Sequence, residues 1–242
     1  MNIAINGFGR IGRAFLRTAT SRNLNVVAIN DLTSPATLAH LFKYDSVHGR
    51  FNGEVTYNED HLIINGKAIK ICAMPNPSEL PWDALSIDLV IEATGKFANL
   101  KGASKHLAAG AKQVLISAPA AEKEVPMVVM GVNDHSINLK AKVLSNASCT
   151  TNAIVPVLKI IDTTFGIEKG HIETVHSYTN DQNLLDNYHK KYRRGRSAAL
   201  NLVITETGAD KAVAKVIPHL GGKLTGNAVR VPTPNVSLAI LN

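Results

Sequence analysis

The stretch Asn2-Ile-Ala-Ile-Asn-Gly7-Phe-Gly9-Arg-Ile-Gly12, at the start of the chain, decides the fold. Its first part, Asn2 to Asn6, is a short apolar run typical of a buried strand, and residues 13–21 continue as an amphipathic helix. A GxGxxG pattern between a strand and a helix is the signature of a turn that binds a pyrophosphate. The stretch therefore predicts a dinucleotide-binding βαβ unit.

Each residue type in this turn has a physical use. Gly7 allows a tight turn, Gly9 lets a pyrophosphate come close to the backbone, and Gly12 lets the helix pack closely on the strand. Arg10 and Ile11 lie between these glycines at the expected helix start, so we expect them to contact the cofactor as well. The alternative is a glycine-rich turn that binds no ligand.

Asp31 indicates which dinucleotide is bound. It follows a second predicted strand, Asn25 to Asn30, and stands at the distance from Gly12 at which this motif carries an acidic residue. A carboxylate there accepts hydrogen bonds from the ribose hydroxyls of NAD and repels the 2′-phosphate of NADP. The sequence therefore predicts NAD as the cofactor, with an Asp31 that only caps a turn as the alternative.

Strands and helices continue to alternate through the first part of the chain. Ligands bind at the carboxyl ends of parallel strands, so Thr94, Gly95 and Ser117 are candidate cofactor neighbours. The predicted class is α/β, with a Rossmann-type doubly wound nucleotide-binding domain over residues 1–148 and an α+β catalytic domain over residues 149–242. We expect further strands at 54–57, 61–64, 68–72, 87–92, 113–117 and 142–145, and helices at 37–42, 101–109 and 153–161.

Cys149 lies in a small polar stretch between a predicted strand and a predicted helix. The first N–H groups of a helix have no intrahelical partner and carry a partial positive charge, which favours a thiolate. Ser148 and Thr150 flank the cysteine as candidate caps or oxyanion partners. The alternative is a buried structural cysteine, which is what we expect of Cys72 within its apolar alternation.

His176 is a candidate base for this thiol. Residues 170–179 alternate as a strand, which places His176 on the same face as Ile172 and Thr174. Without further context, a histidine on a strand is more often structural than catalytic. Thr179 faces the opposite side in a regular strand, so a role for both residues requires the strand to end or twist after His176.

Composition narrows the class of protein. Hydrophobic residues make up 45% and charged residues 19% of the 242 residues, which describes a soluble globular chain without a membrane-spanning run or a secretory signal. Two cysteines can form neither a disulfide framework nor a thiolate metal site, so we expect no metal and a reducing cytoplasm. The net charge of +7 indicates anionic ligands, and the basic segment 189–196 fits either an anion-binding loop or a nucleic-acid patch.

Five segments carry the most specific patterns, and they follow one another along the whole chain. They are Asn6-Gly-Phe-Gly-Arg-Ile-Gly-Arg13, Ser145-Asn-Ala-Ser-Cys-Thr-Thr-Asn152, His176-Ser-Tyr-Thr-Asn-Asp-Gln182, Gly222-Lys-Leu-Thr-Gly226 and Arg230-Val-Pro-Thr-Pro-Asn235. In content and order they resemble the phosphorylating glyceraldehyde-3-phosphate dehydrogenases, and the segment around the cysteine is highly specific for that family.

The resemblance implies roles for the site residues. Cys149 would be the nucleophile and His176 its base. Thr179 and Arg230 match residues near the substrate phosphate. The residues that match those near the inorganic phosphate are Ser148, Thr150, Thr207 and Gly208, and Arg196 is expected to join them, with Arg193 and Arg194 as alternatives.

The resemblance also implies a reaction of glycolysis and gluconeogenesis. Glyceraldehyde 3-phosphate, inorganic phosphate and NAD would give 1,3-bisphosphoglycerate and NADH through a thioester on Cys149. The family is tetrameric, and the residues that match 180–200 lie at a subunit contact there, so the resemblance implies a homotetramer. We expect no membrane and no nucleic-acid partner.

Two alternatives stay open. Erythrose-4-phosphate dehydrogenases share the cysteine motif but tend to lack the Tyr178-Thr179-Asn180 sequence present here, which favours glyceraldehyde 3-phosphate. The other alternative is a non-catalytic product that binds a nucleotide, or binds RNA through residues 190–196.

The chain also departs from the family pattern. Asn187-Tyr188 stands where many members carry Leu-Pro, so the expected preference for NAD rests mainly on Asp31. Family members continue beyond a segment like residues 236–242. We therefore expect an uncovered apolar face and little dehydrogenase activity in the 242-residue form, with the uncovered side chains being Val231, Val236, Leu238 and Ile240.

Overall fold

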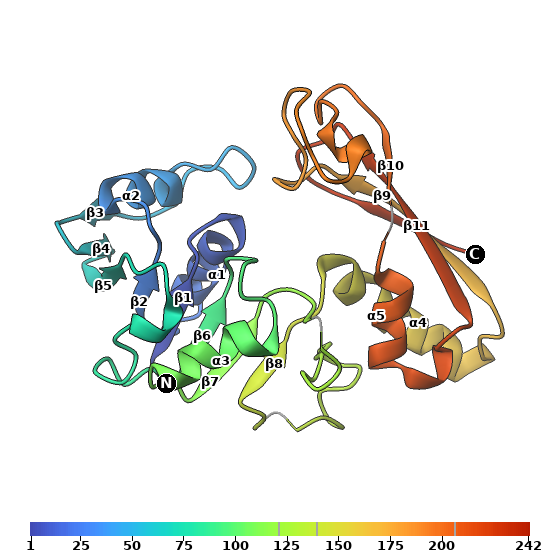
Figure 1. Ribbon diagram of the computed structural model, residues 1–242, viewed down its shortest axis with the longest axis horizontal. Coiled ribbons are helices and arrows are strands. Elements are labelled where there is room, and N and C mark those ends of the chain that lie inside the picture. The colour runs from blue at the N-terminus through green and yellow to red at the C-terminus, as the bar shows by residue number, and fades with distance from the viewer. Residues whose placement is uncertain (121, 139, 206) are drawn as a thin grey trace. The chain divides into compact units, whose positions relative to one another are not determined.

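The computed structural model describes residues 1–120, 122–138, 140–205 and 207–242 (Figure 1). These residues form two compact units. The first comprises Met1–Val128 and Ser136–Ser148, and the second comprises Val129–His135 and Cys149–Asn242. The division along the chain falls directly before Cys149, with the short segment 129–135 belonging to the second unit. None of the helices in the described ranges is long and apolar enough to cross a membrane.

The sheet of the first unit has the strand order of a dinucleotide-binding domain. Its parallel strands run β5-β2-β1-β6-β7-β8, so successive strands are added on one side of β1 and then, from β6, on the other. The predicted Rossmann-type fold is therefore confirmed. The strands are β1 Ile3–Asn6, β2 Val26–Asn30, β5 Lys67–Cys72, β6 Leu89–Glu92, β7 Gln113–Ile116 and β8 Val143–Ser145, and the antiparallel β3 Val55–Tyr57 and β4 His61–Ile64 extend the β5 edge.

Polar caps fix where the helices of this unit begin. Helix α2 (Pro35–Lys43) follows Ser34, whose hydroxyl accepts the N–H of Thr37. Helix α3 (Leu100–Ala108) follows Asn99, whose side chain accepts the N–H of Gly102 at 2.6 Å. Both helices begin close to their predicted positions. The remaining helical segments of the unit are α1 Arg10–Ser21 and the short η1 Pro77–Glu79.

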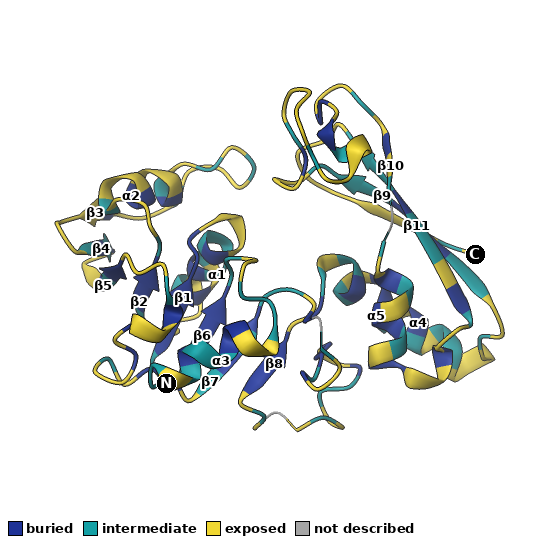
Figure 2. Ribbon diagram, viewed as in Figure 1, coloured by how far each residue is buried: buried dark blue, intermediate teal, exposed yellow. Residues whose placement is uncertain are grey.

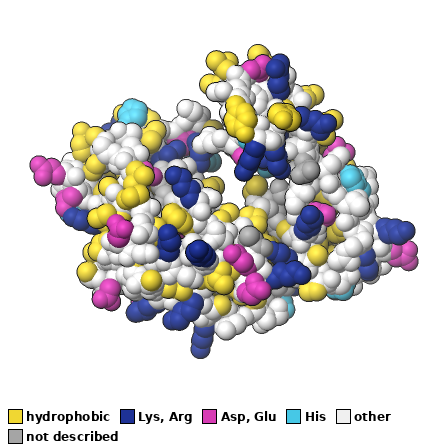
Figure 3. Space-filling model, viewed as in Figure 1, with side chains coloured by type: hydrophobic (Ala, Val, Ile, Leu, Met, Phe, Trp, Pro, Cys, Tyr) yellow, Lys and Arg dark blue, Asp and Glu magenta, His cyan; other side chains and the backbone are white. Residues whose placement is uncertain are grey.

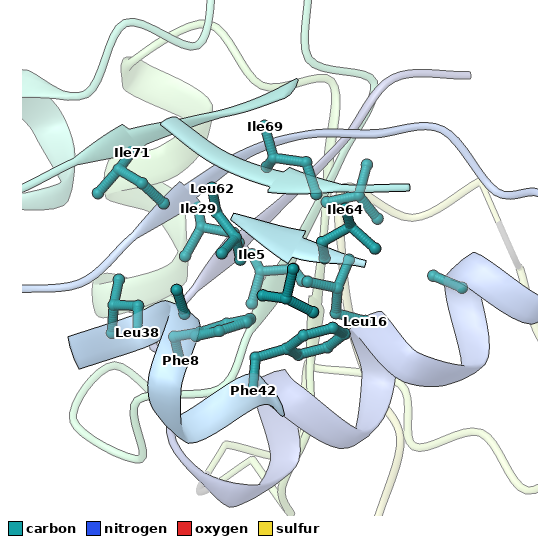
Figure 4. Close-up of a cluster of buried hydrophobic side chains, with 14 of the residues drawn as sticks. Ile5, Phe8, Leu16, Ile29, Leu38, Phe42, Leu62, Ile64, Ile69 and Ile71 are labelled. Carbon is teal, nitrogen blue, oxygen red and sulfur yellow. The ribbon is translucent and has the colours of Figure 1, made fainter. Parts of the chain in front are cut away.

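An apolar cluster holds α1 and α2 on the sheet. Figure 4 shows Phe8 and Phe42 together among aliphatic side chains, and their ring centroids lie 6.0 Å apart. Leu16 of α1 and Ile5 of β1 belong to the same cluster and are fully buried, as are the strand centres drawn in dark blue in Figure 2. Each such side chain contributes about 1.5–3 kcal/mol through burial. The cluster thereby anchors the helix that starts at the glycine-rich turn.

Two tight turns flank β4, and the predicted core cysteine is also present. Asn65 and Gly66 join β4 to β5 with φ angles of +50° and +78°, the left-handed values that a tight two-residue hairpin requires. The side chain of Asn58 accepts the N–H of His61 at 2.8 Å and closes the preceding turn. Cys72, at the end of β5, is buried.

The second unit combines helices with a mixed sheet of order β10-β11-β9-β12 in the described residues. Strands β9 and β11 are parallel, and β10 and β12 pair antiparallel at the two edges. The helix after Cys149 is longer than predicted and begins at the cysteine itself rather than at Ala153. The elements are α4 Cys149–Phe165, β9 Gly170–Ser177, η2 Tyr192–Gly195, β10 Val203–Thr205, α5 Ala209–Val216, η3 Pro218–Leu220, β11 Leu224–Val231 and β12 Leu238–Leu241.

Exposed apolar side chains of this unit include those near β12 and those on the segment 184–204. On and beside β12, Val236, Leu238 and Ile240 are exposed, and Val231 is partly exposed. The segment 184–204 also carries apolar side chains on its surface, where Figure 3 shows hydrophobic atoms among Lys and Arg side chains at the upper right. Its exposed members are Leu184, Leu185, Tyr188, Tyr192, Leu200, Leu202 and Ile204.

Candidate active site and dinucleotide site

The segment between β8 and α4 presents Cys149 at the first position of the helix. Ala147 takes a left-handed conformation with φ +56°, and its N–H donates to the Ser145 hydroxyl at 3.2 Å. That hydroxyl donates in turn to the carbonyl oxygen of Ala118 at 2.7 Å. The cysteine therefore lies where the unpaired N–H groups and the dipole of the helix favour an anion, as predicted.

Cys149 and His176 are brought together within the second unit. The Sγ atom of Cys149 lies 3.6 Å from Nε2 of His176, and the thiol is exposed. The hydrogen bond with His176 lowers the pKa of Cys149 to about 7, against the opposing effect of burial. A smaller contribution in the same direction comes from Thr150, whose hydroxyl is 4.0 Å from the sulfur. A large fraction of this cysteine is thus thiolate near neutral pH.

The other ring nitrogen of His176 determines where its proton lies. Nδ1 is 2.7 Å from the carbonyl oxygen of Ser177, which can only accept, so Nδ1 carries the hydrogen. Arg230 Nη1 also donates to Ser177 O, at 2.9 Å, and its 3.0 Å contact with Nδ1 joins two donors. The neutral ring therefore has an unprotonated Nε2 that can take the proton of the Cys149 thiol. The imidazolium formed in this way donates from Nε2 to the thiolate, which is how His176 lowers the pKa of Cys149.

The pairing of two strands places Arg230 beside His176. It lies opposite His176 in the parallel pairing of β11 with β9. Burial lowers the pKa of Arg230, and the positive charge of nearby Arg194 lowers it further. Cys149 acts on the same pKa in the opposite direction, so the thiol and two guanidinium groups are close enough to influence one another.

Of the three arginines predicted as alternatives, Arg194 lies nearest to this group. Arg194 is 14% exposed, ion-pairs with Asp181 and donates from Nε to the Thr205 hydroxyl at 3.1 Å. Arg196 is 63% exposed and pairs instead with Asp186 at 2.8 Å. The structure therefore does not bring Arg196 to the cysteine. Within the basic segment it is Arg194 that points inward.

The remaining predicted phosphate ligands lie at element ends. Strand β9 ends at Ser177, so Thr179 is released from the strand alternation and is exposed. Gly208 caps α5, with no side chain of its own to fill the cap, and the Thr207 hydroxyl accepts the N–H of Ala209 at 3.2 Å. Ser148 directly precedes Cys149 in the chain.

The glycine-rich turn of the first unit has the predicted geometry. Gly7 has φ +93°, and a β-carbon added to Gly12 would lie 2.1 Å from the carbonyl oxygen of Gly7. Gly9, at the cap of α1, has open space where a side chain would be, and no side chain caps the helix. The start of α1 therefore has both the backbone donors and the room that a pyrophosphate requires.

Comparison with known proteins identifies the family of the chain. Residues 1–100 match the family model described as glyceraldehyde 3-phosphate dehydrogenase, NAD binding domain, and residues 148–242 match that of the C-terminal domain of the same enzyme. The chain belongs to the glyceraldehyde-3-phosphate dehydrogenase family.

Similar proteins support this membership over the whole chain. A glyceraldehyde-3-phosphate dehydrogenase of Geobacillus stearothermophilus is 53% identical over 243 residues, covering 100% of this chain and 72% of the relative. Glyceraldehyde-3-phosphate dehydrogenase 1 of Bacillus cereus is 52% identical, covering 99% and 72%. A chloroplastic relative of Scenedesmus vacuolatus is 52% identical, covering 98% and 76%.

As a member of the glyceraldehyde-3-phosphate dehydrogenase family, the chain is an NAD-dependent oxidoreductase, and its residues fit the cofactor. Asp31 accepts the N–H of Phe8 at 2.8 Å through Oδ2 and the N–H of Thr33 at 3.1 Å through Oδ1. A carboxylate has about four acceptor positions, so two remain for ribose hydroxyls. Asp31 therefore both orders the glycine-rich turn and can bind the ribose.

The predicted cofactor neighbours of the dehydrogenase differ in whether their polar groups already have hydrogen-bond partners within the protein. Gly95 has φ +72° and open space beside its Cα atom. Thr94, however, directs both its N–H and its hydroxyl to Glu92, at 2.8 and 2.5 Å. Ser117 follows β7, and its N–H donates to the carbonyl oxygen of Glu92 at 2.9 Å. Sequence reasoning missed Glu92, whose only signal was a carboxylate ending an otherwise apolar run.

Proposed function

We propose that this chain oxidises and phosphorylates glyceraldehyde 3-phosphate with NAD, using Cys149 as nucleophile and His176 as base. The observation that carries the proposal is the 3.6 Å approach of Cys149 Sγ to His176 Nε2 at the start of α4. The family membership supplies the substrate class, and the thiol with its pKa lowered to about 7 supplies the chemistry.

The first half of the reaction uses the Cys149–His176 pair. The thiolate attacks the aldehyde carbon, and the proton held on His176 passes to the new oxyanion to give a hemithioacetal. The N–H groups at the start of α4 stabilise the negative charge on that oxygen during attack. Unprotonated Nε2 then removes the hydroxyl proton as the carbon is oxidised. Bound NAD supplies the acceptor for the hydride that leaves this carbon.

The second half returns the enzyme to its starting state. The first half leaves a thioester on Cys149 and a proton on His176. Inorganic phosphate attacks the thioester carbon, and the tetrahedral intermediate expels the Cys149 thiolate and releases the acyl phosphate. Ser148, Thr150, Thr207 and Gly208 are proposed to bind the attacking phosphate through hydroxyl and backbone donors.

Two arginines are proposed to bind the phosphate group of the substrate. Arg230 and Arg194 lie close enough for the charge of one to affect the pKa of the other. Two cations held near each other are favourable sites for a phosphate dianion, and Arg binds phosphate through two parallel hydrogen bonds. Thr179, released beyond the end of β9, is proposed to add a hydroxyl. We therefore assign Arg194 to the substrate phosphate, whereas the sequence prediction placed Arg196, or Arg193 or Arg194, with the inorganic phosphate.

We further propose that the active form is a cytoplasmic homotetramer. The exposed apolar side chains along the segment 184–204 form the surface expected to be covered by other subunits. The reducing cytoplasm would keep the exposed Cys149 as the free thiol that attack on an aldehyde requires. Sedimentation and cell fractionation of the native protein test these two points.

An assay of the purified chain tests the function. NADH formation is followed with glyceraldehyde 3-phosphate, NAD and inorganic phosphate, and erythrose 4-phosphate serves as the matched alternative substrate. We expect turnover with the triose that is low in the 242-residue form, requires phosphate and is abolished when iodoacetamide alkylates Cys149. A preference for erythrose 4-phosphate would overturn the substrate assignment, and turnover that survives alkylation would overturn the role of Cys149.

A further inference from the structure

A run of buried hydrogen bonds crosses the carboxyl ends of neighbouring strands in the first unit. Asn30, at the end of β2, donates from Nδ2 to Oδ1 of Asn6 at 2.7 Å. Asn6, at the end of β1, donates from Nδ2 to Oε2 of Glu92 at 2.6 Å. The N–H of Met74, just after β5, donates to Asn30 Oδ1 at 2.9 Å. Each of these donors is oriented so that the run leads toward Glu92, at the end of β6.

A second run reaches Glu92 from the helix side. The indole N–H of Trp82 donates to Nδ1 of His106 at 2.9 Å, and both side chains are completely buried. An indole nitrogen can only donate, so Nδ1 is unprotonated and His106 is the neutral Nε2–H tautomer. Its Nε2–H donates to Oε2 of Glu92 at 3.0 Å.

Glu92 is the acceptor at which both runs end. Its Oε2 accepts from Asn6 and His106, and its Oε1 accepts the N–H and the hydroxyl of Thr94. Burial raises the pKa of Glu92, but the hydrogen bonds from His106, Thr94 and Asn6 outweigh it and hold the pKa below its usual value. Glu92 is therefore a buried carboxylate that accepts four hydrogen bonds.

The carboxylate holds the turn after β6 against the glycine-rich turn. A β-carbon added to Gly7 would lie 2.8 Å from both the backbone nitrogen and the Cγ2 atom of Thr94, so the two turns are in direct contact. Gly95 follows Thr94 and faces open space. Thr94 therefore helps to shape the carboxyl end of the sheet between β1 and β6, where the strand order reverses.

We propose that Glu92 is a positioning residue for the dinucleotide, with Trp82 and His106 fixing its orientation. The carboxylate keeps Thr94 against Gly7 before the cofactor arrives, so the cofactor does not have to order the turn on binding. This inference rests on the use of NAD by the first unit, and it adds a residue that acts on the cofactor through Thr94.

The substitution Glu92→Gln isolates the bond that matters. The new amide can turn its oxygen toward Asn6 and His106, which only donate here. Its NH₂ group then faces the hydroxyl of Thr94, which can accept, and the backbone N–H of Thr94, which cannot. The network behind residue 92 is thereby kept, while the hydrogen bond that holds the turn is lost.

The experiment measures the dissociation constant of NAD by calorimetry on the full chain, well below the melting temperature of each variant. We expect Glu92→Gln to bind NAD about tenfold more weakly, the factor for a competent turn populated about a tenth of the time. The KM for NAD should rise with kcat at saturating NAD unchanged. Emission from Trp82, the sole tryptophan, should keep the wavelength of the parent because its bond to His106 remains.

Asp88→Asn is the matched control. Asp88 directly precedes the opposite end of β6, where it accepts the N–H of Asn2 at 2.7 Å and Lys112 Nζ at 2.6 Å. The substitution removes a carboxylate next to the same strand, and we expect NAD affinity within about twofold of the parent.

Three results would overturn the inference. They are an unchanged NAD affinity in Glu92→Gln, an equal loss in Asp88→Asn, and a red shift of Trp82 emission that accompanies the loss and so indicates general loosening. A parent chain that binds no NAD would instead overturn the cofactor assignment itself, so the failure of the inference and the failure of the proposed function give different results.

Discussion

The two units of this chain each contain a histidine beside an acidic group, and the two rings carry their protons on opposite nitrogens. In the first unit, Trp82 donates to Nδ1 of His106, so the proton lies on Nε2 and points to Glu92. In the second unit, the Ser177 carbonyl accepts from Nδ1 of His176, so Nε2 is unprotonated and faces the thiol of Cys149.

The difference shows that the partner at Nδ1 decides what a histidine can do. A donor at Nδ1 makes His106 a fixed hydrogen-bond donor to a carboxylate that stays ionised, and complete burial prevents water from replacing either partner. An acceptor at Nδ1 makes His176 a base, and its partly exposed position gives a substrate access. The first arrangement maintains structure and the second transfers protons.

Removing the thiol should have the largest effect. Cys149→Ser should lower phosphorylating oxidation on the order of 10⁴-fold or more, the scale seen when a catalytic nucleophile is lost. NAD binding to the first unit should stay nearly intact, because the Glu92 network is untouched. Steady-state kinetics and calorimetry on the same preparation check both parts. Activity above about a hundredth of the parent would contradict the role of Cys149 as nucleophile.

Removing the base comes next. His176→Asn should lower kcat by about 10²- to 10⁴-fold, because an amide can still donate to Ser177 but cannot take a proton from the substrate. The pH midpoint for alkylation of Cys149 should rise from about 7 toward the ~8.5 of a free cysteine. Iodoacetamide rates from pH 5 to 10 measure the midpoint.

A matched control for that experiment comes from the other unit. His106→Asn should leave the alkylation midpoint of Cys149 where it is in the parent, because His106 has no part in the thiol's hydrogen bonding. A midpoint that moves in His106→Asn, or one that stays near 7 in His176→Asn, would remove the distinction between the two histidines.

The arginines of the second unit should give a smaller effect. Arg194→Leu should raise the KM for glyceraldehyde 3-phosphate about 10- to 100-fold, the range for loss of a hydrogen bond between charged groups. Arg196→Leu should change it little, since its guanidinium is exposed and paired with Asp186. The reverse ranking in initial-rate measurements would overturn the assignment of Arg194 to the substrate phosphate.

The smallest of these effects is expected at Asp31. Asp31→Ala should weaken the binding of NAD about tenfold and strengthen the binding of NADP, since the ribose acceptor and the charge that repels a 2′-phosphate are lost together. The alkylation midpoint of Cys149 should remain near 7, because Asp31 acts within the first unit. Competition binding with both dinucleotides measures the ratio of NAD to NADP affinity. An unchanged ratio would mean that Asp31 only accepts the N–H groups of Phe8 and Thr33.

Features with local signals could be predicted from the sequence. The glycine spacing gave the first turn, and apolar periodicity gave the strands on either side of it. The polar stretch before an apolar run placed Cys149 at a helix start, although the helix extends further toward the amino terminus than that run suggested. The need for the strand to end after His176 was also foreseen, and β9 ends at Ser177.

Features that depend on contacts between distant residues could not be predicted. The choice between Arg194 and Arg196 depends on their ion pairs with Asp181 and Asp186 in an irregular segment, where no periodicity tells which side chain points inward. Glu92 and His106 lie on different elements, and neither tautomer is visible without the partner at Nδ1. The charge of Glu92 at the end of an apolar run was the one local sign of this network.

Ala147, two residues before the thiol, limits how this chain can vary. Its left-handed backbone costs a residue with a β-carbon roughly 1–2 kcal/mol, and glycine would avoid the cost. Its methyl group, however, is almost completely buried, so glycine would leave a gap and any larger side chain would have no room. The positive φ angle thus favours glycine at position 147, whereas the buried methyl group favours keeping alanine. Under mutation and selection for activity, position 147 should therefore accept very few residues, fewer than its small and chemically inert side chain would suggest.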